Sequence, residues 1–417
     1  MTHPVLACRS CGQTDLTPVL FLGKMPLADR LLADSMLADA EPALTLTLHF
    51  CAQCALVQIA ECVAPEQLFC EDYPYYSSFS DALLKHSRDN AKELIEQHKL
   101  GEKSLVVELA SNDGYLLKNF IERGIPVLGI DPAEGPAKAA RDAGVETMCA
   151  FFTEPLAREL ASSGRRADVI IGNNVLAHVP DLNGFVAGIG VLLKQEGVAV
   201  IEVPYVKDLI DHCEFDTIYH EHLCYFSVTA LRHLFARHSL SINDVRRLSI
   251  HGGSLRLYVG HKEEISPTVD ALLEDEQSSG VDEIHYYEDF AQRVEQIRES
   301  LLKLLRGLKD EGKRIAAYGA AAKGATLINY VGIGSELLDF VVDRNTHKQG
   351  RYMPGQHIPI LPCDTLVSER PDYCLLLAWN FAEEIMNQQA EYIQRGGRFI
   401  VPIPAPRIIQ EGSVEVH

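Results

Sequence analysis

Two apolar runs that each end in a carboxylate decide the fold class of this chain: LVVELASNDG at residues 105–114 and VLGID at residues 127–131. A polar turn with a glycine and a helical pattern over residues 115–123 lie between them. Strand, tight turn, helix and strand in this order predict a βαβ unit of a parallel sheet.

The turn in this unit lacks the glycines of dinucleotide-binding proteins. A G-x-G-x-x-G motif after the first strand would let the backbone approach a pyrophosphate. Here the first strand ends in Glu108, and Asp131 ends the next strand, where a ribose diol would be held. S-adenosylmethionine contains a ribose and no pyrophosphate, so the pattern indicates a site for this donor. The alternative is an ordinary α/β domain with acids at its strand ends.

Two further segments extend the predicted sheet. ADVIIGNNVLAHV at residues 167–179 is a strand that runs into a polar loop, and GVAVIEVP at residues 197–204 is another strand. Their order and spacing fit the seven-stranded, Rossmann-like α/β sheet of a methyltransferase. Ligands of open parallel sheets lie beyond the carboxyl ends of the strands. The predicted donor-binding residues are Glu108, Asn112, Asp131, Pro132, Asn173 and Asn174.

The composition is ordinary for a soluble enzyme, with 47% hydrophobic and 23% charged residues. A chain of 417 residues can form two or three domains. The formal net charge of −20 disfavours nucleic acid and anionic membranes as partners. No apolar run approaches the roughly 18 residues of a membrane span, and the N-terminus lacks a basic and then apolar leader, so we expect a cytoplasmic protein.

Four of the 11 cysteines form two C-x-x-C pairs, Cys8 with Cys11 and Cys51 with Cys54. Without an export signal, thiols or metal ligands are expected rather than disulfides. Four thiolates around one ion leave no coordination position for water, so we predict a structural zinc site. The alternative is two redox-active or merely buried pairs.

The turn-rich, aromatic segment DYPYYSS at residues 72–78 separates this zinc module from the predicted sheet. The sheet is expected to close with an alternating edge strand at residues 254–260, and the acidic, polar residues 262–280 are interpreted as a linker before a long helix. We therefore predict a zinc-binding module at 1–72, a methyltransferase domain at 73–262 and a Rossmann-like C-terminal α/β domain at 263–417.

The C-terminal unit begins with a predicted strand at residues 315–319 and the small-residue turn AAAKG. Ala325 replaces the lysine of a Walker motif, which argues against nucleotide hydrolysis. A small loop before a helix still favours a phosphate. The basic segment DRNTHKQGR at residues 343–351 follows, and the alternative for it is a solvated loop. The residues predicted to bind the diphosphate of a nucleotide-linked substrate are Lys323, Gly324, Arg344, His347, Lys348 and Arg351.

The segment YHEHLCYF at residues 219–226 gathers several titratable side chains, which favours a polar cleft. We interpret it as the source of a general base near the donor methyl group. A catalytic metal site and a surface cluster are the alternatives, although the H-E-x-x-H spacing of metallohydrolases is absent.

Motifs along nearly the whole chain resemble the nucleotide-sugar C-methyltransferases of deoxysugar biosynthesis. They are the two C-x-x-C pairs, ELASNDG, NNVLAHV, YHEH, HGGSLR, GAAAKG and DRNTHKQGRYMPG. These enzymes methylate carbon 3 of a 4-keto-hexose. The resemblance implies a zinc module, a central methyltransferase fold and a C-terminal α/β domain, with a nucleotide-linked 4-keto sugar bound between the last two.

By motif, the resemblance assigns His222 as the base, with Tyr219 and Glu221 orienting or polarising the sugar and His178 close by. An aromatic residue of YPYY at residues 73–76 is expected to close the site; Tyr73 and Tyr76 are favoured, and Tyr75 is the alternative. Histidine titrates near neutral pH and suits proton abstraction next to a ketone, which also needs donors to the enolate oxygen. The family further implies inversion at carbon 3.

Three alternatives remain at this level. They are an O- or N-methyltransferase acting on a sugar nucleotide, a nicotinamide-dependent oxidoreductase or epimerase, and a zinc-dependent binding module with a degenerate transferase domain. The nucleotide, the carbon 3 substituent (amine or hydroxyl) and the oligomeric state stay open, with a monomer slightly favoured.

Overall fold

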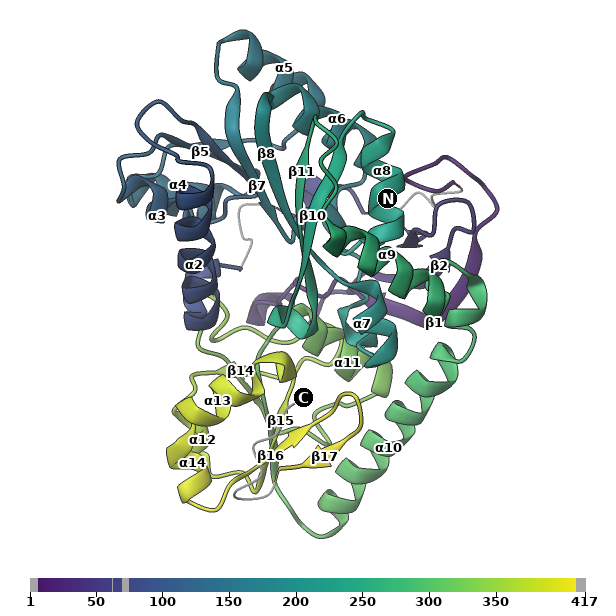
Figure 1. Cartoon of the computed structure of the whole chain (residues 1–417). Coiled ribbons are helices and arrows are strands. Elements are labelled where there is room, and N and C mark those ends of the chain that lie inside the picture. Colours follow the sequence, from purple (N-terminus) through teal and green to yellow (C-terminus); the bar gives the residue numbers. More distant parts are fainter. Residues whose placement is uncertain (1–6, 62, 70–74, 410–417) are drawn as a thin grey trace.

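The computed structural model describes residues 7–61, 63–69 and 75–409. These residues form three sheets, and Figure 1 shows the central sheet above the C-terminal sheet, with the N-terminal strands beside their junction. No helix within the described ranges is both long and apolar enough to cross a membrane.

The central sheet has seven strands in the order β10-β11-β8-β7-β4-β5-β6, which confirms the predicted methyltransferase-type sheet. Every strand is parallel to β4 except β11, which is antiparallel to both of its neighbours. The strands are β4 (Val106–Leu109), β5 (Val127–Asp131), β6 (Thr147–Cys149), β7 (Ala167–Asn173), β8 (Leu193–Pro204), β10 (Ser241–Leu248) and β11 (Ser254–Gly260).

The edge strand differs from the sequence prediction. Residues 254–260 form β11, but this strand lies between β8 and β10, and all of its residues are buried. The partly exposed β10 is the edge strand instead. An alternating pattern does not separate an edge strand from an inner one when polar side chains such as Arg256 are buried in an ion pair with Glu202.

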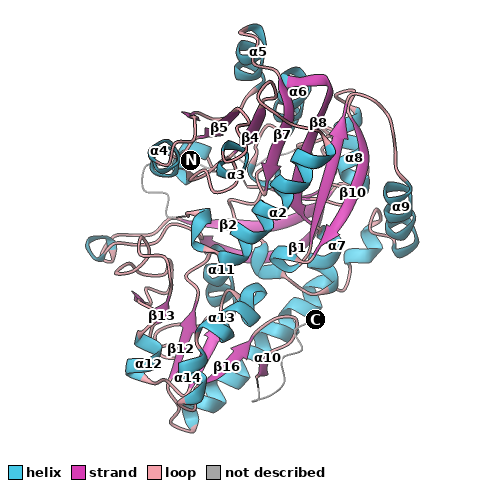
Figure 2. Ribbon diagram, turned by 60° about the vertical axis from the view of Figure 1, so that its left-hand side comes forward, coloured by secondary structure: helices cyan, strands magenta, loops and turns pink. Residues whose placement is uncertain are grey.

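Helices cover both faces of the central sheet (Figure 2). Neighbouring residues of β4 point to opposite faces: Val106 packs in the cluster that includes α2 and α3, and Val107 packs in the main core with α5, α6 and α8. The helices of this region are α2 (Asp81–Gln97), α3 (Lys118–Ile121), α4 (Glu134–Asp142), α5 (Glu154–Ser162), α6 (Leu182–Leu192), α7 (Val206–Asp211) and α8 (Val228–Ala236).

The N-terminal sheet has the order β1-β2-β3-β9, and its last strand comes from much later in the chain. Val57 and Gln58 of β3 pair with Tyr225 and Cys224 of β9. This pairing attaches the end of the YHEHLCYF segment to the N-terminal module. The elements are β1 (Thr17–Pro26), β2 (Ala43–Phe50), β3 (Val57–Ile59), α1 (Pro65–Leu68) and β9 (Cys224–Tyr225).

The four paired cysteines converge beside this sheet. The Sγ atoms of Cys8 and Cys54 are 3.6 Å apart, those of Cys11 and Cys51 3.5 Å, and those of Cys54 and Cys51 3.8 Å. A zinc ion with four sulfur ligands at about 2.3 Å separates neighbouring sulfurs by about 3.8 Å. The geometry therefore fits a four-thiolate zinc site. This is the one group of potential metal ligands found within the described part of the chain.

The C-terminal sheet has the order β14-β13-β12-β15-β16-β17 and is parallel except for β17. Its strands are β12 (Ile315–Tyr318), β13 (Val341–Val342), β14 (Ile360–Leu361), β15 (Tyr373–Leu376), β16 (Arg398–Val401) and β17 (Arg407–Ile408). The helices are α9 (Pro267–Ser279), α10 (Phe290–Asp310), α11 (Ala322–Val331), α12 (Thr365–Glu369), α13 (Ala382–Gln388) and α14 (Ala390–Gln394).

The predicted linker at residues 262–280 is wrong, because most of it forms helix α9. Its proline lies in the first helical turn, where the missing N–H costs nothing. Glu276 is fully buried and accepts hydrogen bonds from the backbone N–H groups of Val228 and Thr229 at the start of α8. A residue that reads as a solvated acid therefore fixes α9 to the central region.

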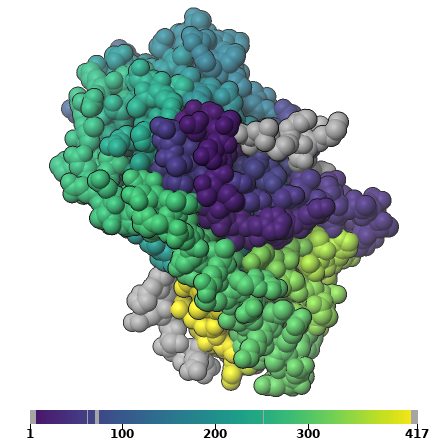
Figure 3. Space-filling model, turned by 90° about the vertical axis from the view of Figure 1, so that its right-hand side faces the viewer, coloured from purple at the N-terminus to yellow at the C-terminus, as the bar shows by residue number. Residues whose placement is uncertain are grey.

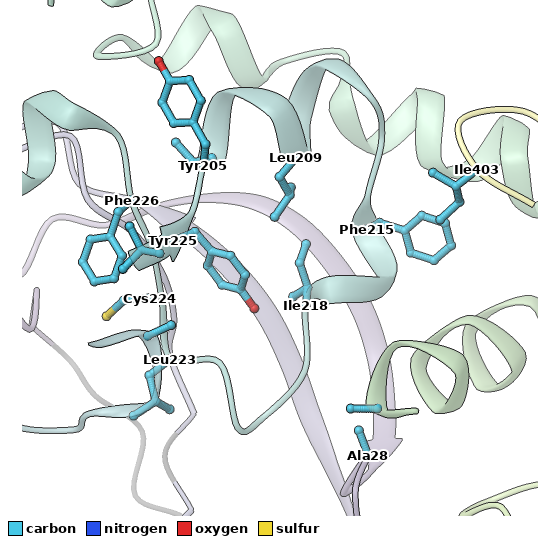
Figure 4. Packing of buried hydrophobic residues seen from close by; sticks show 14 of the residues in the cluster. Ala28, Tyr205, Leu209, Phe215, Ile218, Leu223, Cys224, Tyr225, Phe226 and Ile403 are labelled. Atoms are coloured by element: carbon cyan, nitrogen blue, oxygen red, sulfur yellow. The ribbon is translucent and has the colours of Figure 1, made fainter. Parts of the chain in front are cut away.

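One hydrophobic core runs through all three sheets. Phe215 packs on Tyr330 of α11 with ring centroids 5.2 Å apart, and Figure 4 shows Phe215 beside Ile403 of the C-terminal region. In Figure 3 the N-terminal residues pack between the central and C-terminal parts on the visible face. This continuous packing fixes the position of the C-terminal sheet relative to the ends of the central strands.

Replacing both Cys8 and Cys11 by serine should remove half of the zinc ligands and yield insoluble or partly unfolded protein, because the metal site stabilises the fold. Metal analysis and thermal unfolding followed by circular dichroism measure the effect. Cys149→Ser is the matched control, since Cys149 is exposed and lies outside the cluster. A double variant that is metal-free and melts at the wild-type temperature contradicts the structural role of zinc.

Candidate active site

A cavity of about 920 Å³ lies beyond the carboxyl ends of the parallel central strands and faces the C-terminal sheet. It is lined by residues from all three sheets and their loops. Asp29 comes from the N-terminal module, Asp131, His178 and His222 from the central region, and Lys348 from the C-terminal region. The size and the three-sided wall are suited to two ligands that meet inside.

Asp131 lies at one end of this cavity, at the last position of β5. Its Oδ2 accepts a hydrogen bond of 2.8 Å from the backbone N–H of Asn112, and its Oδ1 accepts one of 2.9 Å from that of Ala133. Burial raises the pKa of Asp131 to about 6, although these N–H groups oppose the shift. The carboxylate is thus held by the backbone and still carries lone pairs toward the cavity.

Glu108 lies behind the cavity wall rather than in it. Its side chain is 1% exposed, and burial together with Asp131 and Asp113 raises its pKa well above the usual range. Its Oε2, like Oδ1 of Asn174 on the cavity wall, is buried without a hydrogen-bond partner among the described residues. The unpaired Oδ1 of Asn174 on the cavity wall is consistent with a polar ligand that supplies a hydrogen-bond donor.

The remaining predicted donor-binding residues line the same end of the cavity, together with aromatic residues that the sequence analysis missed. Phe151 and Phe152 follow β6 and offer apolar surface next to Asp131, and Phe151 keeps 36% of its surface exposed. Two phenylalanines after a strand are usually core residues, so no sequence signal distinguished them. The predicted residues lining this end are Asn112, Asp131, Pro132, Asn173 and Asn174.

His222 and Tyr219 form a pair on the cavity wall. The Nδ1 atom of His222 lies 3.0 Å from the carbonyl oxygen of Thr217, and its Nε2 lies 2.9 Å from the Tyr219 hydroxyl. A carbonyl oxygen can only accept, so Nδ1 carries the proton. In the neutral ring, Nε2 therefore holds the lone pair and accepts the Tyr219 hydrogen bond.

His178 packs edge-on against His222, with ring centroids 4.6 Å apart. Its Nδ1 donates a hydrogen bond of 2.7 Å to the carbonyl oxygen of Glu221, so the neutral ring carries no proton on Nε2. Burial lowers the pKa of His178 to about 4. This imidazole is neutral at neutral pH and is a weak proton acceptor.

The Glu221 side chain turns away from the cavity toward the N-terminal module. Its Oε1 accepts a hydrogen bond of 3.2 Å from the backbone N–H of Asp29, and its side chain is 4% exposed. Burial and the nearby Asp29 raise the pKa of Glu221 to about 8. Asp29 lines the cavity itself. Sequence analysis missed it, since a single acid after an apolar run carries no local signal.

The aromatic residues expected to close the site are only partly accounted for. Tyr73 lies outside the described residues. Tyr76 does not line the cavity but stacks on His347, with ring centroids 4.5 Å apart and an interplanar angle of 12°. Tyr75, its neighbour, lines the cavity instead.

Two of the six residues predicted to bind the diphosphate, Lys323 and Lys348, line the cavity. Lys348 is buried and donates a hydrogen bond of 2.7 Å from Nζ to the carbonyl oxygen of Ala320. The Nζ of Lys323 lies 4.6 Å from the centre of the Trp379 ring, and burial lowers its pKa against the pull of Asp216. The residues that do not line the cavity are Gly324, Arg344, His347 and Arg351.

Gly324 allows close packing of α11 and does not contact the cavity. A Cβ at this position would lie 2.8 Å from that of Leu377, so the helix approaches β15 closely only with glycine here. Arg344 is exposed and lies 3.4 Å from both Asp81 and Glu384. Asn380, from the short 3-10 helix at Trp379–Phe381 that follows β15, also lines the cavity and was missed because nothing marks it in the sequence.

Comparison with known proteins agrees with this architecture. A zinc binding domain family matches residues 8–69, a methyltransferase domain family matches residues 81–243, and the C-methyltransferase C-terminal domain family matches residues 249–404. The C-methyltransferase NovU of Streptomyces niveus is 38% identical over 416 residues, which cover 99% of each chain.

More distant similarity is confined to part of the chain. A ubiquinone biosynthesis O-methyltransferase of Azorhizobium caulinodans is 26% identical over 125 residues, covering 29% of this chain and 47% of its own. Among solved structures, the PH0226 protein of Pyrococcus horikoshii OT3 covers 46% of this chain and 96% of its own, with a TM-score of 0.36 and 15% identity.

The full-length similarity, the three matching domain families and the donor-type sheet agree with one another. The chain therefore belongs to the family of S-adenosylmethionine-dependent C-methyltransferases with an N-terminal zinc-binding domain.

Proposed function

We propose that the protein transfers the methyl group of S-adenosylmethionine to carbon 3 of a nucleotide-linked 4-keto-deoxyhexose. The observation that carries the proposal is the His222–Tyr219 pair, which lies in the same cavity as Asp131. Carbon next to a ketone is weakly acidic, so methylation at carbon needs both a base and a hydrogen-bond donor for the enolate oxygen. Family membership excludes the oxidoreductase and the binding-module alternatives.

In this mechanism His222 rather than His178 is the base. The Nε2 atom of His222 carries a lone pair because Nδ1 donates to Thr217. His178 also presents an unprotonated Nε2, but its pKa of about 4 makes it a poor proton acceptor. The one N–H group of the neutral His178 ring donates to the carbonyl oxygen of Glu221, so in this proposal Tyr219 is the donor to the enolate oxygen.

The proposed step moves one proton and one methyl group. The substrate ketone displaces the Tyr219 hydroxyl from His222, and Tyr219 then donates to the ketone oxygen. The carbon 3 proton moves to Nε2 of His222, and its bonding electrons form the enolate. The enolate carbon attacks the sulfonium methyl in line, where positioning supplies several kcal/mol, and sulfur leaves as the neutral thioether. Opposite faces for proton loss and methyl entry give inversion.

The C-terminal side of the cavity supports a diphosphate in this proposal. Lys323 and Lys348 are cations on the cavity wall of a chain with a net charge of −20. They flank the loop between β12 and α11, and the cavity reaches the crevice where β12 neighbours both β13 and β15. Ligands of open α/β sheets bind at such topological switch points. Helix dipole and backbone N–H groups at the start of α11 add to the attraction.

His222→Asn should lower turnover by about 10²–10⁴-fold and leave the affinity for S-adenosylhomocysteine unchanged, because only proton transfer is removed. Single-turnover kinetics and calorimetry measure the two quantities. His98→Asn is the control, since His98 follows α2 and is exposed. Wild-type turnover in His222→Asn eliminates His222 as the base.

Carbon acidity separates this reaction from O- or N-methylation of the same sugar. With a thymidine diphosphate 4-keto-6-deoxyhexose and S-adenosylhomocysteine in deuterated water, we expect enzyme-dependent loss of the carbon 3 proton signal in nuclear magnetic resonance. His222→Asn should abolish this exchange. An O- or N-methyltransferase produces no exchange. The ketone at carbon 4 acidifies the C–H groups of both carbon 3 and carbon 5. Exchange at carbon 5 alone would indicate that carbon 5, rather than carbon 3, is methylated.

Asp131→Ala should raise the dissociation constant of S-adenosylhomocysteine by about tenfold or more, because a hydrogen bond to a charged group contributes about 1.5–3 kcal/mol. The carboxylate is the better acceptor, so in the wild type affinity should fall as the pH drops through about 6, the pKa of Asp131. Calorimetry between pH 5 and 8 tests both effects. Asp142→Ala, which removes an exposed acid of α4, is the control and should show the same dependence of affinity on pH as the wild type. If the affinity of the wild type does not depend on pH, Asp131 is not the acceptor for the donor.

A further inference from the structure

The side chain of Asn112 is occupied by protein contacts, although it lines the donor end of the cavity. Its Oδ1 accepts a hydrogen bond of 2.9 Å from the backbone N–H of Ser77, and its Nδ2 donates one of 3.2 Å to the carbonyl oxygen of Tyr75. The residue is 7% exposed. Both ends of the amide therefore hold the segment that precedes α2, which we call the 75–79 segment.

Asp131 fixes the backbone that carries this amide. Asn112 has a φ of +49°, in the left-handed region, and its N–H is bonded to Asp131 Oδ2. Asparagine tolerates this conformation better than most residues. Asp113 adds a weaker contact, because its Oδ2 accepts a hydrogen bond of 3.2 Å from the N–H of Ser78. Asp131 is therefore linked to the 75–79 segment through the backbone and the side chain of Asn112.

The other side of the 75–79 segment contacts the C-terminal region. Tyr76 stacks on His347, and Phe79 meets the same ring edge-on at 6.2 Å. His347 immediately precedes Lys348, which lines the cavity. A continuous set of contacts thus joins Asp131 to the basic loop at residues 343–351 through the Asn112 amide and the Tyr76–His347 ring stack.

We propose that Asn112 is a positioning residue that couples the two ligand sites, so that donor bound at Asp131 orders the 75–79 segment and, through Tyr76 and His347, the basic loop. The inference rests on the proposed function only in assigning Asp131 to the donor and the loop to the sugar nucleotide. By thermodynamic linkage, the donor then raises the affinity for the acceptor. The sugar nucleotide would bind to a loop that is ordered mainly when the methyl donor is present.

Hydrogen exchange of the full-length, zinc-loaded protein tests the coupling, with S-adenosylhomocysteine as the probe. In the wild type, the ligand should slow exchange in peptides covering residues 75–81, 129–134 and 344–351, by about fivefold or more in the last. In Asn112→Gly, which keeps the backbone conformation and removes the amide, protection should be confined to 129–134. Lys99→Gly, at an exposed residue with a φ of +50°, is the matched control and should behave as wild type.

A second pair of variants isolates the ring stack. Tyr76→Leu should leave ligand protection at 75–81 and abolish it at 344–351, whereas Tyr76→Phe should restore it, because phenylalanine can keep the stack on His347. The inference is overturned if the ligand does not protect 344–351 in the wild type, or if Asn112→Gly or Tyr76→Leu retains that protection. Failure to methylate 4-keto sugars would instead contradict the proposed function and would not alter these exchange results.

Discussion

The pairing of β3 with β9 is the contact on which the cavity depends. Two strands far apart in the sequence meet there, through Gln58 and Cys224. The residue just before β9, Leu223, is held from two sides: its N–H donates to the carbonyl oxygen of Ala177, and its carbonyl oxygen accepts from Ile59. The imidazole of His222 is therefore fixed beside that of His178. Cys51 and Cys54 lie between β2 and β3, so a zinc ion at the four-cysteine site would support the strand that pairs with β9 and, in our proposal, help to position the base.

Burial shifts the pKa values of several titratable side chains in and around this cavity. Two neighbouring imidazoles each donate Nδ1 to a backbone carbonyl, and His178 is kept neutral by burial. Among the acids, burial raises the pKa of Asp131 to about 6, whereas burial and the nearby Asp29 raise that of Glu221 to about 8. In the proposed reaction, fixed dipoles of the protein would stabilise the charge that develops during proton transfer.

The three sheets divide the tasks in the proposed reaction. The central sheet presents the donor end, the loop held by β9 presents the base, and the C-terminal sheet presents cations. Their shared core fixes this arrangement, as the packing of Phe215 against Tyr330 illustrates. The contact from Asn112 to His347 crosses the same junction at the cavity itself, so in our proposal the junction transmits ligand binding as well as holding the parts together.

The sequence by itself determined the sheet type, the donor class and the four-cysteine cluster, because each depends on short-range spacing: strand periodicity, an acid at a strand end, and paired thiols. Only the tertiary structure decided which side chains face the cavity. Glu221 adjoins His222 in sequence yet points to the N-terminal module, Asp29 enters from that module, and Asn112 binds the 75–79 segment. Side-chain direction in loops is set by long-range contacts that no local pattern encodes. The same reason explains why residues 262–280 were wrongly predicted to be a linker: the buried Glu276 of α9 forms its hydrogen bonds with residues of another helix, α8.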